Sequence, residues 1–408
     1  MAASNQAILD WIAGRQGLMV QRVIEWSQIN SYSFNTQGLG RLADVLVRDF
    51  SSLGGEVRRH RLPAAKFLDS RAQEASRPLG EAISFTRRPG AAMRVLLNIH
   101  MDTVYPPDAP AAIVREAEGK LIGPGVADAK GGIAVMLTAL EALEQSEHAG
   151  KIGWTVVINP DEEIGSPASA GLLAELARGH QFGLLFEPAL PDGALVDRRK
   201  GSGNFSIVVR GRAAHAGRDF ASGRSALLAA AKVSLGLHAL NESLPGVTVN
   251  VGSIDGGSPP NVVPDLAVCR INIRITEPSG EPRVVEAVKK LVADLNGMEG
   301  IRAELHGHFA SPPKVLDERT GRLLEAIVSC GGELGLKLGT RASGGASDGN
   351  RLAAAGLPNI DSLGVRGDRI HSSEEYLIPP SLPERAQLAA LLMLKIVSGD
   401  IEARPFCR

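Results

Sequence analysis

The sequence has 408 residues, of which 44% are hydrophobic and 22% charged, and its formal net charge is -1. This length suits two folded domains, and the composition is that of a globular α/β protein rather than a disordered or fibrous one. A net charge near zero provides no overall attraction to nucleic acid or to an anionic membrane surface, so we expect partners of neither kind.

The number of cysteines and the first ten residues indicate the cellular compartment of the protein. The chain has three cysteines, an odd and small number that argues against a disulfide framework and for a reducing compartment. The first ten residues lack the basic and apolar regions of a secretion signal. No apolar run approaches the length of a membrane-spanning helix. We therefore expect a cytoplasmic protein.

The first half of the chain alternates helical and strand patterns of apolar residues, which predicts a mostly parallel sheet flanked by helices. Residues 68–92 lack clear periodicity, and we expect a loop or hairpin there. The other segments are, in order, helices over 6–29 and 36–53, strands through Val57 and over 95–100, a helix over 131–143, a strand over 154–158, a helix over 168–178 and a strand over 182–186.

From about residue 200 the order of elements changes to β-α-β-β-α-β, which predicts a ferredoxin-like α+β domain. Patterns of the first kind then resume, so this unit is inserted into the first domain. We expect the first domain to comprise 1–199 and 311–408, and the inserted domain to comprise 200–310. The inserted elements are, in order, a strand at 205–210, a helix at 222–240, strands at 247–254 and 266–275, a helix at 282–295 and a strand at 301–307.

Polar residues follow four apolar runs of the first domain. His100 and Asp102 close the first run, and their spacing places both side chains on one face of a strand. The other runs end at Asp128, at Asp161-Glu-Glu163 and at Glu187. The carboxyl ends of strands in an open α/β sheet meet at the edge where such folds bind ligands. We therefore expect these side chains to form one site.

Histidine and carboxylate side chains are the ligands that zinc accepts in this kind of arrangement. His100, Asp128, Glu163 and Glu187 would hold two metals together with a second histidine, provided that one carboxylate is shared. Three carboxylates and a bridging hydroxide balance the four positive charges of two Zn²⁺. His371 is the one histidine after the insertion, so we expect it to be the fifth ligand. Co²⁺ and Mn²⁺ are alternatives to zinc, because metal availability competes with affinity.

Two further acids suit other roles at this site. Glu162 is adjacent to Glu163, and neighbouring residues of a regular element cannot both reach one metal. Glu162 is therefore free to take a proton from water and to pass it to a leaving nitrogen. Asp102 is expected to hold His100 through its other ring nitrogen. A place in a solvated loop is the alternative for any one of these residues.

Six segments form a set of motifs, namely His100-Met-Asp102, Gly125-Val-Ala-Asp128-Ala-Lys-Gly-Gly132, Asp161-Glu-Glu163, Glu187, Gly344-Gly-Ala-Ser-Asp348-Gly and His371. This set resembles the di-zinc metallopeptidase family of carboxypeptidase G, aminoacylase, succinyl-diaminopimelate desuccinylase and allantoate amidohydrolase. The resemblance covers nearly the whole chain. It is nearest to the carboxypeptidase G branch, which comprises glutamate carboxypeptidases.

The resemblance implies a zinc exopeptidase-like fold with an inserted dimerisation or lid domain, and two Zn²⁺ per subunit. It implies that Glu162 is the general base acting on a metal-bridging water, and that the Asp128–Ala129 peptide is cis. The implied ligand roles are Asp128 as the bridge, His100 and Glu187 on one metal, and Glu163 and His371 on the other.

The resemblance also points to residues of the inserted domain and of one later loop. His215 matches a histidine that enters the active site of the partner subunit and stabilises an oxyanion. Asn261 and Arg274 match positions that bind the carboxylate of the substrate, a group with which arginine makes two charge-assisted hydrogen bonds. The strand pattern alone would make Arg274 a solvent-facing charge. We expect Gly344 and Gly345 to let the backbone approach the substrate closely.

Other polar residues receive structural interpretations. The basic run Arg198-Arg199-Lys200 is interpreted as a solvated hinge, with a role in substrate binding as the alternative. Asp348 is expected to support the loop beneath the metals. We expect His238, His306 and His308 to be structural.

These features predict a metal-dependent hydrolase that cleaves an amide or peptide bond next to a free carboxylate. The expected substrate is a dipeptide or an N-acyl amino acid, and the expected assembly is a homodimer formed through the inserted domain. One alternative is an N-carbamoyl or ureido amidohydrolase of the same family. The other is a catalytically inactive, metal-dependent binding protein.

Overall fold

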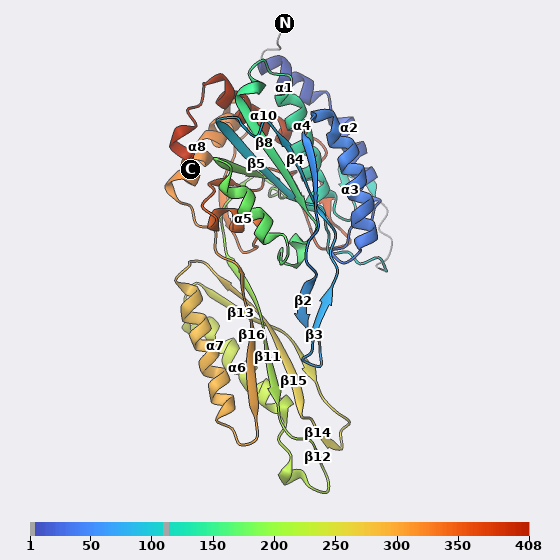
Figure 1. The fold of residues 1–408 in the computed structure, drawn as a ribbon, viewed down its shortest axis with the longest axis vertical. Coiled ribbons are helices and arrows are strands. Elements are labelled where there is room, and N and C mark those ends of the chain that lie inside the picture. The colour runs from blue at the N-terminus through green and yellow to red at the C-terminus, as the bar shows by residue number, and fades with distance from the viewer. Residues whose placement is uncertain (1–4, 109–113, 408) are drawn as a thin grey trace.

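The computed structural model describes residues 5–108 and 114–407. Residues 1–4, which begin the segment examined for a secretion signal, lie outside this range. The described chain forms an elongated molecule with two lobes (Figure 1). The described part of the chain begins and ends in the larger lobe, and the smaller lobe extends from it.

A six-stranded mixed sheet forms the centre of the larger lobe. In spatial order its strands are β1 (Glu56–His60), β4 (Ala82–Arg87), β8 (Ile152–Asn159), β5 (Met93–His100), β9 (Phe182–Leu185) and β18 (Asn359–Ile360). The last four strands run parallel, whereas β4 pairs antiparallel with both β8 and β1. The prediction of a mostly parallel sheet is confirmed.

Helices bury both faces of this sheet. All eight residues of β8 are buried, which is typical of a strand covered on both sides. On one face lies α4 (Gly132–Leu143), which buries 11 of its 12 residues and also packs against α10 (Ser381–Ser398). On the other face, α5 (Ala170–Arg178) and α9 (Asp348–Ala354) complete a second apolar cluster with β5, β8 and β9.

The remaining helices of the larger lobe are α1 (Asn5–Ala13), α2 (Gln16–Ser27), α3 (Thr36–Phe50) and α8 (Glu318–Glu333). The single helix predicted over 6–29 is thus two helices, interrupted at Gly14 and Arg15. Short helical turns occupy Ser51–Leu53 (η1), Val126–Gly131 (η2), Ala149–Lys151 (η3), Glu162–Ile164 (η4), Phe220–Ser222 (η5) and Arg404–Phe406 (η6).

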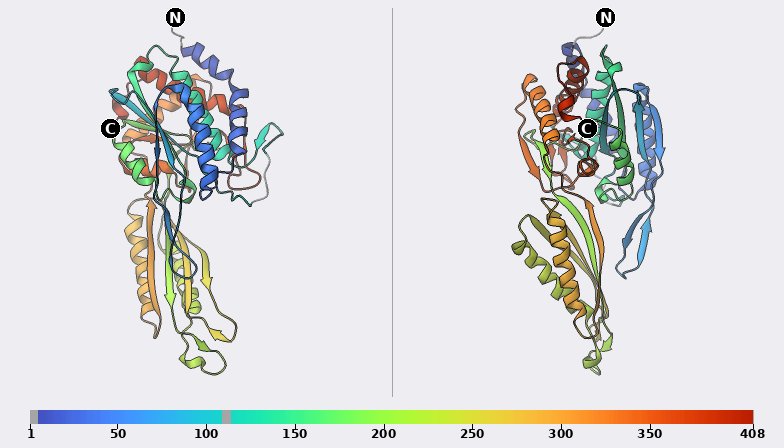
Figure 2. Two further views of the ribbon diagram at one scale, coloured as in Figure 1. Left: turned by 45° about the vertical axis from the view of Figure 1, so that its right-hand side comes forward. Right: turned by 60° about the vertical axis from the view of Figure 1, so that its left-hand side comes forward.

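Residues 68–92 hold more structure than the sequence predicted. The strands β2 (Ala65–Leu68) and β3 (Glu74–Arg77) form the expected hairpin, which projects from the larger lobe beside the smaller one (Figure 2). The strand β4 was not predicted, because Ser84 and Thr86 interrupt its apolar residues. It is nevertheless an inner strand, paired on both sides by β1 and β8.

The smaller lobe has the predicted order of elements. These are β11 (Gly201–Arg210), α6 (Ala226–Ser243), β13 (Val247–Gly256), β15 (Leu266–Ile275), α7 (Gly280–Asn296) and β16 (Arg302–Ser311). The four strands form an antiparallel sheet in the order β13-β15-β11-β16, and both helices cover its apolar face. The ferredoxin-like fold is confirmed, whereas the exact division at residues 200 and 310 stays a prediction.

Short strands complete the fold. At the far end of the smaller lobe, β12 (Ala214–His215) pairs with β14 (Val262–Val263). In the larger lobe, β10 (Leu195–Arg199) pairs with β17 (Thr340–Ser343), and a small sheet has the order β19 (Gly367–Asp368), β20 (Tyr376–Leu377), β7 (Lys120–Ile122) and β6 (Arg115–Ala117). None of the helices in the described ranges combines the length and apolarity needed to cross a membrane.

Candidate metal centre

Two groups of side chains converge at the carboxyl edge of the central sheet. His100, Asp128 and Glu187 form the first group, and Asp128, Glu163 and His371 form the second. In each group the potential ligand atoms lie within 4.8 Å of one another. The structure therefore brings all five predicted ligands together, and the carboxylate common to both groups is that of Asp128.

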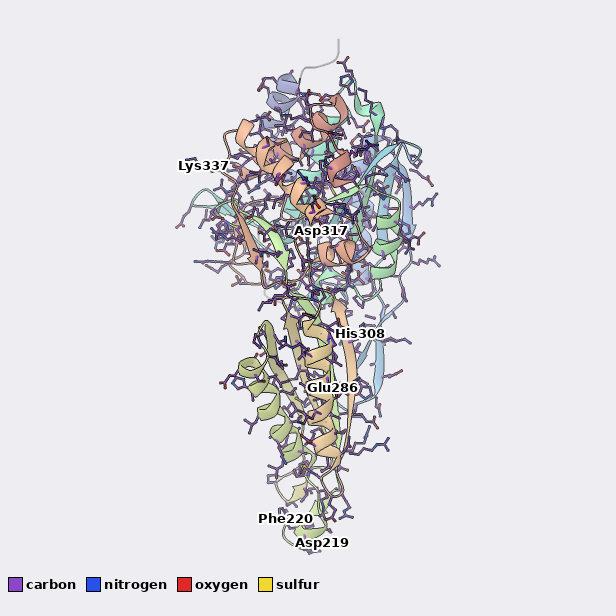
Figure 3. All side chains as sticks on the ribbon, turned by 90° about the vertical axis from the view of Figure 1, so that its left-hand side faces the viewer. Asp219, Phe220, Glu286, His308, Asp317 and Lys337 are labelled. Atoms are coloured by element: carbon purple, nitrogen blue, oxygen red, sulfur yellow. The ribbon has the colours of Figure 1, made fainter. Side chains whose placement is uncertain are left out.

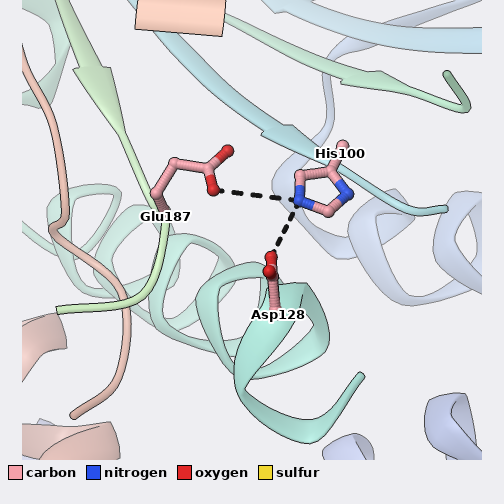
Figure 4. Close-up of side chains that lie close together, drawn as sticks. All are labelled: His100, Asp128 and Glu187. Atoms are coloured by element: carbon pink, nitrogen blue, oxygen red, sulfur yellow. Dashed lines mark hydrogen bonds and ion pairs between the residues drawn. The ribbon is translucent and has the colours of Figure 1, made fainter. Parts of the chain in front are cut away.

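The first group is built on the parallel pairing of β5 and β9. His100 ends β5 and Glu187 follows β9, so the pairing carries both side chains to the same edge. His100 Nε2 lies 3.0 Å from Asp128 Oδ1 and 3.8 Å from Glu187 Oε2 (Figure 4). All three residues are buried, and burial raises the pKa of Glu187 to about 8.

The second group joins segments that are far apart in the sequence. His371 lies between β19 and β20, which pair with each other, and the pairing of β20 with β7 brings it near Asp128. Its Nε2 is 3.1 Å from Glu163 Oε2 and 3.3 Å from Asp128 Oδ2. Hydrogen bonds to Asp128 and Glu163 raise the pKa of His371 to about 10, and burial raises the pKa of Glu163 to about 7.

The donor set fits two divalent cations. Imidazole nitrogen and carboxylate oxygen are donors that zinc accepts, and three protein ligands per metal leave a position for water or substrate. Burial raises the pKa of both Glu163 and Glu187, so charged carboxylates are unfavourable here unless a cation lies between them. Several acids thus lie close together in one buried volume, and a pair of metal ions would offset the repulsion between their charges.

Asp128 lies in the irregular turn η2 that precedes α4. The Asp128–Ala129 peptide is cis, as the resemblance implied. Gly132, at the start of α4, packs directly on the strand end that carries Glu187, because a Cβ atom at this position would lie 2.0 Å from the carbonyl oxygen of Phe186. The close approach of helix and strand therefore sets the distance between Asp128 and Glu187.

Asp102 connects the two parts of the site. Its Oδ1 lies 3.3 Å from His100 Nδ1, which is the contact predicted for it. Its carboxylate also accepts hydrogen bonds of 3.1 Å from the backbone N–H groups of Glu162 and Glu163. Ser33 Oγ donates a further bond of 2.7 Å. Asp102 thus orients both His100 and the turn that carries the two glutamates.

Glu162 and Glu163 have different surroundings, although they are adjacent. Glu163 contacts His371, whereas the side chain of Glu162 has no hydrogen-bond partner within the described ranges. Burial and the charge of Glu187 raise the pKa of Glu162 well above its usual range. A free carboxylate with a raised pKa beside the two groups is suited to proton transfer.

Residues 96–395 match the sequence pattern of peptidase family M20/M25/M40. The chain belongs to this family. Carboxypeptidase G2 of Pseudomonas sp. (strain RS-16) is 27% identical over 400 residues, which cover 94% of this chain and 90% of that protein. Succinyl-diaminopimelate desuccinylase of Nitrosospira multiformis is 26% identical over 290 residues, which cover 67% of this chain and 74% of that protein.

A solved M20 family metallo-carboxypeptidase from Sulfolobus solfataricus shares the fold with a TM-score of 0.73. The match covers 92% of this chain and 98% of that chain at 16% identity. The resemblance inferred from the motifs is confirmed by these comparisons. The protein is a member of an M20 family of metal-dependent hydrolases with carboxypeptidase-like and deacylase-like relatives.

In this M20 chain, the sequence reasoning missed Glu375. Its buried carboxylate accepts hydrogen bonds from the N–H groups of the Asp128 turn and from a tyrosine, namely Gly125 (3.0 Å), Ala127 (2.9 Å), Asp128 (2.9 Å) and the hydroxyl of Tyr105 (2.6 Å). The adjacent acids Glu374-Glu375, shortly after His371, were the available signal. Such a pair in a loop is usually solvated, so the pattern did not single out Glu375.

The prediction of a solvated hinge is wrong for Arg199. Its side chain is 9% exposed and donates hydrogen bonds of 2.6 and 3.0 Å to the carboxylate of Asp361. A third bond, of 3.3 Å, goes to the carbonyl oxygen of Gly345. Arg199 therefore connects the entry to the smaller lobe with the Gly344–Gly345 loop. A Cβ atom at Gly344 would meet nothing within 4 Å, so this part of the loop is open.

The structure does not bring His215 or Asn261 to the metal centre of their own subunit. Both are exposed at the far end of the smaller lobe, where Asn261 O accepts a bond of 2.8 Å from the N–H of Ala216. Figure 1 shows β12 and β14 there, away from β5 and α4. Arg274, in contrast, lies at the end of β15 nearest the larger lobe. Burial lowers its pKa, and the charge of Glu162 opposes this effect.

Proposed function

We propose that this M20 chain is a dinuclear zinc hydrolase that cleaves an amide or peptide bond next to a free carboxylate, in the manner of a glutamate carboxypeptidase. One observation supports this most directly. Asp128 belongs to both three-residue groups, with one carboxylate oxygen toward His100 and the other toward His371. A single metal would not need a carboxylate placed between two such groups. Co²⁺ and Mn²⁺ remain alternatives to zinc.

The five ligands divide between two metals. His100 and Glu187 would hold one, Glu163 and His371 the other, and Asp128 both. When bound, metals in such a site polarise the scissile carbonyl and lower the pKa of water. Asp102 keeps His100 oriented through its Nδ1 atom and holds the turn of Glu163 through a backbone bond.

Glu162 is the proposed general base and acid. It takes a proton from the attacking water and delivers it to the leaving amine nitrogen, so the same carboxylate serves both steps. The raised pKa of Glu162 suits this exchange, because a carboxylate with a higher pKa is a stronger base toward the attacking water. The absence of a side-chain partner in the described ranges leaves its oxygens available to water.

The carboxylate end of the substrate is assigned to Arg274, to the Gly344–Gly345 loop and to Asn261 of the partner subunit. Arg274 Nε donates to Asn272 Oδ1 at 2.8 Å, which orients the guanidinium while leaving its other N–H groups for a substrate. The position of Arg274 beside the larger lobe is consistent with this role.

A homodimer formed through the smaller lobe would complete the site. His215 and Asn261 are far from the metal centre of their own subunit, so they act only if they reach that of another, where His215 of the partner subunit would stabilise the oxyanion. Helix α6 carries Leu228 and Leu235, which are 70% and 75% exposed and lie two turns apart on one side of the helix. This apolar strip suits contact with a second copy.

The test is hydrolysis of a pool of dipeptides and N-acyl amino acids by the zinc-loaded protein, compared with Glu162→Gln. We expect amine release to fall by about 10²–10⁴-fold in the variant while metal content stays the same. Glu175→Gln, an exposed glutamate on α5, is the matched control and should retain full activity. Equal activity in Glu162→Gln would remove Glu162 from the mechanism.

The same pool separates the remaining alternatives. Release of ammonia or carbon dioxide from N-carbamoyl or ureido substrates, without cleavage of dipeptides, would favour an amidohydrolase of that kind. No hydrolysis of any substrate by the metal-loaded protein would favour a binding protein. The cytoplasmic location stays a proposal that rests on the sequence.

A further inference from the structure

The two segments that join the lobes lie against each other. The chain enters the smaller lobe between β10 and β11 and leaves it after β16. Figure 3 shows His308 of β16 in the smaller lobe, close to the junction, and Asp317 in the larger lobe. The backbones of Arg199 and Lys314 exchange two hydrogen bonds of 3.0 Å there. The orientation of the smaller lobe is therefore set by this pair of segments and by what holds them.

Asn350 of α9 binds both joining segments at once. Its Nδ2 donates hydrogen bonds to the carbonyl oxygen of Lys200 at 3.1 Å and to that of Pro312 at 2.8 Å. Its Oδ1 accepts the N–H of Ser347 at 3.1 Å, so both ends of the amide are engaged. The side chain is fully buried. One asparagine thus connects α9 with the chain on its way into and out of the smaller lobe.

Arg351, the next residue, connects the smaller lobe with the turn of Glu162. Its guanidinium donates a hydrogen bond of 2.5 Å to the carbonyl oxygen of Ala310 in β16 and another to that of Gly165. Gly165 directly follows η4, the turn that contains Glu162. The guanidinium also lies 3.6 Å from the carboxylate of Asp348. One side chain therefore contacts both a strand of the smaller lobe and the turn of the proposed general base.

Asp348 attaches α9 to the same turn from both sides. Its carboxylate accepts a hydrogen bond of 2.7 Å from Asn159 and one of 2.5 Å from the hydroxyl of Ser166. These partners precede and follow Glu162 in the sequence, and all three residues of the network are buried. Hydrogen bonds in such surroundings are strong. Asp348 was expected to support the loop beneath the metals, and the segment that it holds is the one that carries Glu162.

We propose that Asn350 and Arg351 are positioning residues that fix the orientation of the smaller lobe relative to Glu162. The proposal rests on the proposed function, in which Arg274 of the smaller lobe holds the carboxylate of the substrate while Glu162 acts at the scissile bond. The distance between these two groups depends on the junction of the lobes. A displacement of about 1 Å between reacting groups is enough to lower a rate by about 10²-fold. The bonds of α9 therefore couple recognition of the carboxylate to the chemistry.

The experiment compares kcat/KM for the dipeptide or N-acyl amino acid that the zinc-loaded protein cleaves best with kcat/KM for its C-terminal amide. The ratio of the two values does not depend on the fraction of folded enzyme. We expect Asn350→Ala and Arg351→Met each to lower this ratio about tenfold, because a charge-assisted hydrogen bond to the carboxylate is lost. Asn296→Ala is the control and should keep the ratio, since Asn296 binds Ala303 at 2.8 and 3.0 Å within the smaller lobe.

Hydrogen exchange provides a second measurement that requires no activity. The N–H groups that pair Arg199 with Lys314 should exchange faster in Asn350→Ala and in Arg351→Met than in the unmodified protein, because the junction then opens more often. Exchange there should stay unchanged in Asn296→Ala. Arg351→Met retains an apolar stem of similar length, so it tests the same junction if Asn350→Ala does not fold.

Each outcome has a separate meaning. An unchanged ratio of kcat/KM values in both folded variants would overturn this inference and leave the proposed function intact. An equal decrease of the ratio in Asn296→Ala would also overturn it, because a general loss of stability would then explain the effect. Absence of hydrolysis of every substrate by the unmodified, metal-loaded protein would overturn the proposed function, and this inference with it.

Discussion

Glu375 illustrates how one buried carboxylate organises the candidate metal centre. It accepts the N–H of Asp128 and lies 2.6 Å from the hydroxyl of Tyr105. The same hydroxyl is 2.9 Å from the carbonyl oxygen of Ser372, the residue after His371. His371 itself has a φ of 62°, in the left-handed region. Contacts with other segments are therefore needed to hold its loop in this conformation. Glu375 and Tyr105 therefore hold the Asp128 turn and the His371 loop in one arrangement.

We predict that Glu375→Gln weakens metal binding by about 10–100-fold, because the amide N–H₂ of glutamine would face N–H or O–H donors. The loss should be larger for the metal held by Glu163 and His371. Metal titration after dialysis against a chelator measures both affinities, and circular dichroism checks the fold. Glu374→Gln is the control, since Glu374 is exposed and its carboxylate pairs with Arg369 at the surface. Unchanged affinities in Glu375→Gln would contradict the prediction.

At the scale of elements, the contact between α4 and the end of β9 controls the site. Besides Gly132, a Cβ atom at Gly364 would lie 2.2 Å from the same Phe186 carbonyl oxygen. Two glycines thus let two further segments reach the backbone just before Glu187. Backbones can approach each other this closely only because glycine has no side chain. The carboxylates of Asp128 and Glu187 share one histidine as a result.

Gly132→Ala should overpack this contact and destabilise the larger lobe by about 1–3 kcal/mol. A lowered midpoint in denaturant-induced unfolding, with reduced metal content, is the expected result. Gly171→Ala on α5 provides the comparison, because a Cβ atom there meets nothing within 4 Å. That substitution should be neutral or stabilise by up to about 1 kcal/mol. Equal stability of the two variants would show that the contact tolerates a methyl group.

The whole molecule is elongated, and its proposed catalytic residues lie in different lobes. Glu162 lies in the larger lobe, whereas His215 lies at the tip of the smaller lobe (Figure 1). Within one subunit the two cannot act on the same bond. A symmetric dimer would give each metal centre the tip of the other subunit, since each contact of a two-fold dimer occurs twice.

Co-expression of Glu162→Gln and His215→Ala subunits tests this arrangement. Each variant alone should have little activity. In a mixed dimer, one site combines an intact Glu162 with an intact His215 of the partner subunit, and random pairing makes half of the dimers mixed. We therefore expect about a quarter of the unmodified activity from the mixture. Activity no higher than that of the separate variants would show that His215 does not act across subunits.

Much of the site followed from the sequence, because its ligands are recognisable by residue type and by their places after apolar runs. Parallel strands bring their carboxyl ends to one edge whatever the loops between them, so His100, Glu163 and Glu187 had to meet once the strands were identified. The order of elements in the smaller lobe was likewise readable, because strand and helix periods differ.

The tertiary structure alone decided the partners of buried polar groups. Arg199 pairs with Asp361 across 162 positions, and Glu375 binds the N–H of Ala127 across 248. No local pattern marks such pairs, since a buried charge and a solvated one occur in similar sequences. The strand β4 was also decided by its neighbours, because its pairing with β1 and β8 encloses Ser84, which is buried, and Thr86, which is half-buried. Side-chain chemistry and spacing along the chain thus determined the kind of site, whereas packing between distant segments determined how it is held.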